Sequence, residues 1–362
     1  MIRFRLDGRP DVVGFALSPL TEAVASLHVL LFPKVHAVQH GWIRAMRRVS
    51  PELKREIRAF SFLFENAFPD CFIPPELDTR IGFDDHLARV RRLAPAAARY
   101  ELARPLFHYA EASAGGEEQL ADEATRERIL DWARGSAGGE GAERLAGLIL
   151  DEPVQALERL VALLERYWED AFAAEWARLA DDLEQAVVES TAAIEAEGTL
   201  SFLARHNALR REGDTIVRRS PHEHTVEITP ERRLMLTPSA YVWPHVRVNC
   251  DAPWPLVVIY PAGFVTREAA RRAAPPELLS LLRAAGDDSR LRILKLVAER
   301  PRTTEELAPL VSLSEPALSR HLRILGEAGL VSARRDGYYV LYRLERSALA
   351  RLSAELQGFL EG

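Results

Sequence analysis

The sequence predicts a mainly α-helical protein with α+β parts, arranged in three successive regions. Helical spacing of apolar residues dominates residues 1–212. Strand-like runs separated by proline and glycine fill residues 213–270, which predicts a small antiparallel sheet docked on the helical part. Residues 275–362 indicate three short helices, a two-stranded hairpin and a terminal helix. We therefore expect a helical N-terminal domain, a β-rich subdomain and a separate C-terminal module.

Composition places the chain among ordinary globular proteins. Its 362 residues suffice for two or three domains, with 48% hydrophobic and 28% charged residues and a net charge of −6. Two cysteines far apart in sequence predict no disulfide framework, and no apolar run approaches the length of a membrane span. Catalytic signatures and phosphate-binding glycine loops are absent. We expect a cytoplasmic protein without a cofactor or an enzymatic activity.

In the N-terminal region, alternation predicts a strand at 2–6, and Ser18-Pro19 predicts a helix that runs to about Phe32. Pro153 begins the longest helical stretch, which extends to about Glu197. Four aromatic residues crowd one short segment: Phe60, Phe62, Phe64 and Phe68. These side chains fit either core packing or the wall of a ligand pocket.

The C-terminal module carries strong local signals. Thr303 and Glu306 have the spacing of a capping box at the start of its second helix. Ser314 is expected to cap the third helix, 314–327. Leucines line one face of that helix, and Ser319, Arg320 and Arg323 fall on the other. A helix with an apolar back and a serine–arginine face suits the major groove of DNA.

A hairpin at 330–344 follows the third helix, with Asp336-Gly337 expected to provide the positive φ values of its turn. Arginine and tyrosine side chains cluster at its tip, where they could reach phosphate and the minor groove. Tyr338 and Tyr339 could instead pair across the hairpin. Likewise, Arg320 and Arg323 could form only a solvated helical face.

These motifs resemble the ArsR-type family of winged-helix transcriptional regulators. The resemblance rests on Asp288-Ser-Arg-Leu-Arg-Ile-Leu, Leu313-Ser-Glu-Pro-Ala-Leu-Ser-Arg-His-Leu and Leu325-Gly-Glu-Ala-Gly-Leu-Val, and covers about 278–350. Asp288 replaces the usual proline, Ser312 replaces the usual glycine of the turn, and Pro309 is expected to shorten the second helix. The resemblance implies binding to double-stranded DNA through Ser314, Glu315, Ala317, Ser319, Arg320, His321, Arg323, Arg334, Arg335, Tyr338 and Tyr339.

Local charge bears on how such a module would bind. Residues 314–335 contain four arginines and two glutamates, a net charge of +2, which provides few phosphate contacts. We therefore expect a homodimer on an inverted repeat. The resemblance implies a two-fold interface of leucines on the helices that flank the module: Leu278, Leu282, Leu349, Leu352, Leu356 and Leu360. Alternatively, the terminal leucines pack on the N-terminal domain of the same chain.

The N-terminal segment, from Met1–Leu6 into the Ser-Pro-Leu-Thr-Glu-Ala-Val helix, looks similar to a poorly characterised domain that some ArsR-like regulators carry. We expect this domain to receive an unknown effector or partner. The usual family metal sites are absent, because no cysteine occupies the second helix and no histidine the last. We therefore expect no metal. The alternative is a metal-dependent enzyme or interaction protein with a site around His222, His224 and His245.

Overall fold

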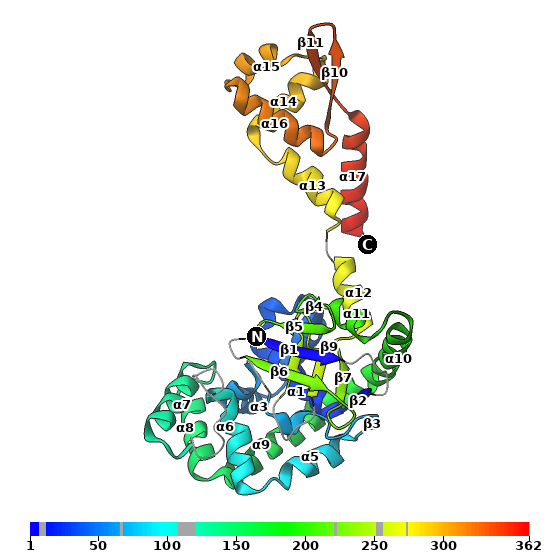
Figure 1. Ribbon diagram of the computed structural model, residues 1–362. Coiled ribbons are helices and arrows are strands. Elements are labelled where there is room, and N and C mark those ends of the chain that lie inside the picture. The colour runs from blue at the N-terminus through cyan, green and yellow to red at the C-terminus, as the bar shows by residue number, and fades with distance from the viewer. Residues whose placement is uncertain are drawn as a thin grey trace. The chain divides into compact units, whose positions relative to one another are not determined.

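The computed structural model describes residues 1–6, 12–65, 68–107, 120–220, 223–250, 256–272 and 274–361 (Figure 1). It divides into an N-terminal unit, Met1–Ala269, and a C-terminal unit, Ala270–Gly362. No helix in the described ranges combines the length and the apolar character that crossing a membrane requires. Both cysteines, Cys71 and Cys250, are buried and free.

A five-stranded, mostly parallel sheet forms the centre of the N-terminal unit. Its order is β3-β2-β7-β9-β8, and only the edge pair of β8 and β9 is antiparallel. The strands are β2 (Val13–Leu17), β3 (Thr79–Arg80), β7 (Leu234–Ser239), β8 (Arg247–Asn249) and β9 (Leu256–Pro261). Every residue of β7 and β9 is buried. Both faces of the sheet are therefore covered, as is usual for parallel strands with continuous apolar runs.

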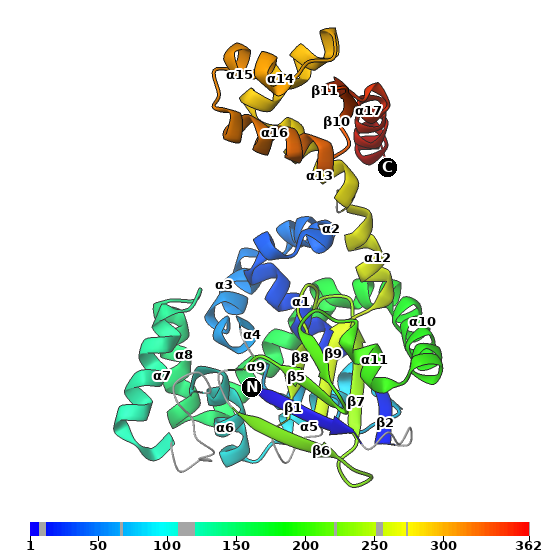
Figure 2. The ribbon, with the colours of Figure 1, turned by 45° about the horizontal axis from the view of Figure 1, so that its top comes forward.

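A second sheet has the order β4-β5-β1-β6, with β1 (Ile2–Leu6) antiparallel to β5 and parallel to β6. Its other strands are β4 (Leu209–Glu212), β5 (Thr215–Arg218) and β6 (His224–Ile228). Ile2, Phe4 and Leu6 share one hydrophobic core with residues of β7 and β9. The alternation that predicted the strand at 2–6 thus identifies its buried face. β1 lies between β5 and β6 (Figure 2).

The predicted antiparallel sheet within 213–270 is wrong. Strands from that range divide between two sheets, and each sheet recruits a strand from the first 17 residues. The expected boundary at 212/213 therefore crosses shared sheets, since β4 and β5 pair across it. Parallel pairing requires long crossover connections, and strand patterns along the chain do not reveal the partner of such a strand.

Helices of the N-terminal unit build a separate large core. α1 (Pro19–Leu31) is capped by Ser18, as expected, and is buried from Pro19 to Val29. Phe60, Phe62, Phe64 and Phe68 belong to the same core, which confirms their packing role. α9 (Pro153–Tyr167) continues through a π-helical stretch, Trp168–Phe172, into α10 (Ala173–Glu197), so the long predicted helical stretch is confirmed.

The remaining helices of this unit span at most 13 residues. The α-helices are α2 (His40–Ala45), α3 (Pro51–Ala59), α4 (Phe62–Glu65), α5 (Phe83–Arg91), α6 (Pro95–Phe107), α7 (Glu123–Gly135), α8 (Glu140–Asp151) and α11 (Thr199–Ala204). Short 3-10 turns are η2 (Pro33–Val35), η3 (Ala37–Gln39), η4 (Met46–Arg48) and η5 (Asp70–Phe72). α12 (Gly263–Arg272) follows β9.

The C-terminal unit contains five helices and one hairpin among its described residues. They are α13 (Pro276–Ala285), α14 (Asp288–Glu299), α15 (Thr304–Val311), α16 (Glu315–Glu327), β10 (Val331–Asp336), β11 (Tyr339–Leu344) and α17 (Arg346–Glu361). α14, α15 and α16 pack around a core that includes Ile293, Leu307 and Leu318. α13 packs against α17. This is the three-helix and hairpin arrangement expected for a winged helix-turn-helix.

Candidate nucleic-acid interface

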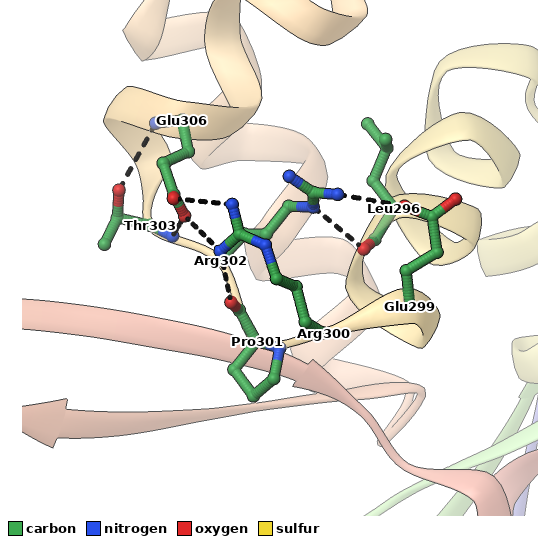
Figure 3. A network of polar contacts seen from close by, with 7 residues as sticks. All are labelled: Leu296, Glu299, Arg300, Pro301, Arg302, Thr303 and Glu306. Carbon is green, nitrogen blue, oxygen red and sulfur yellow. Dashed lines mark hydrogen bonds and ion pairs between the residues drawn. The ribbon is translucent and has the colours of Figure 1, made fainter.

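Two caps hold the helices that support the candidate interface. The Asp287 carboxylate accepts a hydrogen bond from the Arg290 amide at 3.0 Å and begins α14. At α15, the Thr303 hydroxyl accepts from the Glu306 amide at 3.2 Å, and the Glu306 carboxylate accepts from the Thr303 amide at 3.1 Å (Figure 3). This reciprocal arrangement confirms the predicted capping box.

Two arginines tie the same turn to its neighbours. Arg300 donates to the Glu306 carboxylate at 2.9 Å. Arg302 donates through Nε to the Leu296 carbonyl at 3.0 Å and through Nη2 to Glu299 at 2.9 Å (Figure 3). Since carbonyls in the last turn of a helix lack intrahelical donors, the Arg302 side chain satisfies a group at the end of α14.

The turn between α15 and α16 has a left-handed residue at the position where the family has glycine. Ser312 adopts φ +56° and ψ +41°, so the substitution preserves the turn conformation. Pro309 lies within α15, which continues to Val311. Glycine is favoured at such a φ because other residues incur a steric cost there.

Helix α16 is oriented by its leucines. Leu318, Leu322 and Leu325 are buried in the core of the unit, and each such side chain stabilises the fold by about 2 kcal/mol relative to an exposed one. Ser319, Arg320 and Arg323 are exposed on the opposite face, as expected. α16 thus has one face anchored in the core and an opposite polar face that is exposed.

The start of α16 corrects one prediction. Ser314 occupies the N-cap position with extended backbone angles, but its hydroxyl makes no capping hydrogen bond. Pro316 is the second helical residue and has no amide hydrogen to donate. Ser314 and Glu315 are exposed, and Ala317 is half-buried. The exposed Ser314 hydroxyl is therefore not committed to the cap.

The arginines on the exposed face of α16 have few ion-pair partners. Within the described ranges, Arg320 has no ion-pair partner, and Arg323 has only Glu327, at 4.0 Å. His321 is half-buried, and its Nδ1 lies 3.7 Å from the Asp287 carboxylate. The Asp287 contact orients His321 toward α14, which agrees with a packing role more than with base contact.

The wing, residues 330–344, has a tip displaced by one residue from the predicted turn. Asp336 pairs with Tyr339, so Gly337 and Tyr338 form the turn, and of the four only Gly337 has a positive φ, +60°. Glycine first in a two-residue loop suits a tight hairpin. Arg334 and Arg335 are exposed and lack an ion-pair partner in the part of the chain that the structure describes.

The tyrosines of the wing are not a cross-strand pair. Tyr338 and Tyr339 contact each other edge-to-face, with ring centroids 5.8 Å apart, although they are neighbours in sequence. Their exposed fractions are 87% and 53%. The predicted pairing across the hairpin is therefore wrong, and both rings are accessible at the tip.

The predicted interface leucines differ in accessibility. Leu278 is buried within the chain, and Leu352 and Leu356 are half-buried. Leu352 packs on the core of the C-terminal unit. The exposed members are Leu282, Leu349 and Leu360. The leucines proposed from the two flanking helices thus include core residues as well as surface residues.

The alternative histidine site falls partly outside the described residues. His222 lies outside the described residues, and His224 is half-buried on β6. His245 instead lies beside His28 and His36, which are far from it in sequence. The sequence reasoning missed these two, because each stands alone in a helical segment without a motif.

Comparison with known proteins assigns both units. A family model described as a family of unknown function, DUF5937, matches residues 6–266, and the bacterial regulatory protein arsR family model matches 287–333. The Escherichia coli transcriptional regulator YgaV is 31% identical over 94 residues, which cover 26% of this chain and 95% of that protein. The chain belongs to the DUF5937 family and, through its C-terminal unit, to the ArsR family.

Other relatives match about a quarter of this chain or less. The Pseudomonas putida arsenic resistance transcriptional regulator ArsR1 is 38% identical over 24% of this chain and 66% of that protein. The chain spans only 58% of the Mycobacterium tuberculosis regulator KmtR. A homodimeric winged helix-turn-helix DNA-binding domain from Mycobacterium bovis is 31% identical, over 24% of this chain and 79% of that one, with a TM-score of 0.20.

Proposed function

We propose that this DUF5937 protein is a DNA-binding transcriptional regulator in which α16 enters the major groove. The observation that carries the proposal is the division of α16 into a buried leucine face and an exposed face with Ser319, Arg320 and Arg323. Arginine is the commonest side chain to read guanine in the major groove. Relatives of this unit are named as transcriptional regulators, which supports the same role.

The wing would contact the DNA backbone or the minor groove. Arg334, Arg335 and the exposed tyrosines of the tip supply charge and hydrogen-bond donors there. Phosphate contacts of this kind position a protein on DNA without reading sequence. In this proposal, α16 provides sequence specificity, and the wing positions the protein on the DNA backbone.

A homodimer would compensate for the small charge of each module. Two recognition helices related by a two-fold axis lie about 34 Å apart on an inverted repeat. The match to a domain named as homodimeric supports this assembly. In the same proposal the N-terminal unit receives an effector, and that effector biases the arrangement of the two modules.

The test begins with the genomic fragments that co-purify with the protein, which yield an operator. Arg320→Ala should weaken operator binding about 5- to 150-fold, the equivalent of 1–3 kcal/mol for one base contact. Arg335→Ala should weaken binding to all DNA sequences alike. It should also lower the slope of log affinity against log salt concentration by about one. Arg210→Ala, an exposed arginine of β4, is the control. Unchanged operator affinity in both variants of the C-terminal unit would refute the assignment.

A further inference from the structure

Three histidines from separate parts of the N-terminal unit converge on one point. His28 lies on α1, His36 lies between η2 and η3, and His245 precedes β8. Their ligand-capable atoms all lie within 4.8 Å of one another. Ring centroids are 5.1 Å apart for His28 and His36, and 6.1 Å and 5.9 Å from these two to His245.

The two buried histidines are oriented by backbone carbonyls. His28 Nδ1 lies 2.7 Å from the Phe64 carbonyl, and His36 Nδ1 lies 2.6 Å from the Trp243 carbonyl. A carbonyl can only accept, so each Nδ1 carries the hydrogen and each Nε2 keeps its lone pair. A second-shell carbonyl of this kind fixes the tautomer of metal-ligating histidines.

The two lone pairs are not used within the described part of the chain. Nε2 of His28 and Nε2 of His36 are both buried, and neither makes a hydrogen bond to any residue that the structure describes. The residues are 8% and 0% exposed. Buried polar atoms are normally satisfied, so a pair of unsatisfied acceptors at one point calls for a ligand.

The charge state of the cluster also suits a ligand site. Burial, reinforced for His28 by the charge of Arg247, lowers the pKa of His28 to about 3, and burial lowers that of His36 to about 4. Burial, then Arg247 and Arg218, lowers the pKa of His245. Metal coordination requires the neutral imidazole, which is the form that burial favours.

We propose that His28, His36 and His245 bind one zinc-class transition-metal ion through their imidazoles. Imidazole suits Zn²⁺, Co²⁺, Ni²⁺ and Cu²⁺, whereas Mg²⁺ and Ca²⁺ prefer oxygen ligands. Tetrahedral bonds of about 2.0–2.1 Å place ligand nitrogens roughly 3.4 Å apart, so the cluster must contract. His245 is exposed, so its side chain can move to close the site and leave an entry path.

Three neutral ligands leave the charge of the ion uncompensated. Arg247 adds a positive charge nearby and is held with its guanidinium carbon 3.8 Å from the centre of the Phe68 ring. An anionic fourth ligand, either hydroxide or a small anion, is therefore favoured at the open position. Three histidines with one open position are the arrangement of reactive or exchangeable zinc sites rather than closed structural ones.

The experiment uses the full chain without a histidine tag, stripped with a chelator and free of DNA, so its outcome does not depend on the proposed regulator role. Co²⁺ is titrated and followed by visible absorption, and Zn²⁺ is counted by elemental analysis after gel filtration. We expect one ion per chain. His245→Ala should lower the affinity about tenfold or more, since even second-shell changes cost 10- to 100-fold.

Controls separate this cluster from other histidines. His224→Ala, on β6, and His40→Ala, exposed on α2, should bind as the unaltered chain does. His36→Asn should abolish binding, and its folding is checked by circular dichroism. If that variant does not fold, the exposed His245 decides alone. Absence of a stoichiometric ion in the unaltered chain, or full affinity in His245→Ala, would overturn the proposal.

Discussion

Arg302 and Tyr342 exchange both of their backbone hydrogen bonds. The Arg302 amide donates to the Tyr342 carbonyl at 3.0 Å, and the Tyr342 amide donates to the Arg302 carbonyl at 2.8 Å. The connection between α14 and α15 thereby pairs with β11 of the wing. The Arg302 side chain bonds meanwhile to the end of α14 (Figure 3). One residue therefore links the wing to the helices that support α16.

Arg302→Ala should loosen the wing. The substitution removes the donor to the Leu296 carbonyl. It also uncovers the residues beneath the Arg302 side chain, which is only 13% exposed. We expect a loss of about 1–3 kcal/mol in the stability of the C-terminal unit, because a partly buried acceptor loses its donor. Hydrogen exchange at the Tyr342 amide should accelerate. Arg343→Ala, whose side chain is exposed, is the control, and equal protection in both variants would contradict the link.

Ser312→Gly should stabilise the C-terminal unit. Ser312 has φ +56°, where a residue with a Cβ atom incurs a steric cost. Part of the gain is lost to the greater freedom of glycine in the unfolded chain, so we expect about 0.5–1 kcal/mol. Ser312→Val should have the opposite sign, because a β-branched residue tolerates this φ poorly. Urea unfolding curves measure both, and equal midpoints would disprove the role of φ.

Glu22 should make the N-terminal unit less stable as pH rises. Burial raises its pKa to about 7, although Ser239 and the Ala240 amide, 3.0 Å away, stabilise the ionised form. Between the unfolded value near 4.5 and the folded value, the unfolded state releases the proton and the folded state keeps it. Below pH 4.5 the neutral carboxyl contributes its full share, about 3 kcal/mol, to the free energy of unfolding. This contribution is lost as the pH rises through 7.

Glu22→Gln should remove that dependence. Relative to the unaltered chain, the variant should gain thermal stability between pH 5 and pH 8, because the amide has no proton to lose. Buried histidines such as His86, whose pKa burial lowers to about 4, make stability rise with pH instead. Because both chains carry them, their contribution cancels in the comparison. Melting temperatures at several pH values provide the measurement. Glu52→Gln, exposed on α3, is the control. A stability difference independent of pH would rule out the raised pKa.

Leu349→Glu combined with Leu360→Glu should prevent assembly of the proposed dimer. The exposed fractions of these residues are 39% and 73%, so charge can be introduced without disturbing the core. Leu352 is a poorer choice, since it packs on the core of its own unit. Light scattering should show a monomer, and Val188→Glu on α10, 61% exposed, should leave the mass unchanged. A double variant that remains dimeric would place the interface elsewhere.

The local signals of the C-terminal unit allowed its fold to be predicted in detail. The Thr303–Glu306 cap, the leucine stripe of α16 and the opposite arginine face depend on residues within one or two turns of each other. Such signals depend only on residues close together in the sequence, and the tertiary structure agrees with them. The turn of the wing lies one residue later than predicted, because Asp336 pairs with Tyr339 across the hairpin.

Tertiary structure alone decided the architecture of the N-terminal unit. β1 and β2 join strands more than 200 residues later, and Gln39 donates to the Ala240 carbonyl across 201 positions at 2.9 Å. The histidine cluster has the same origin, since the His36 ring meets the Trp243 carbonyl from 207 positions away. The sequence by itself indicated the amphipathic helices and the strand at 2–6, but not the strand β2 at Val13–Leu17. Which faces meet depends on packing between distant segments, which no local periodicity records.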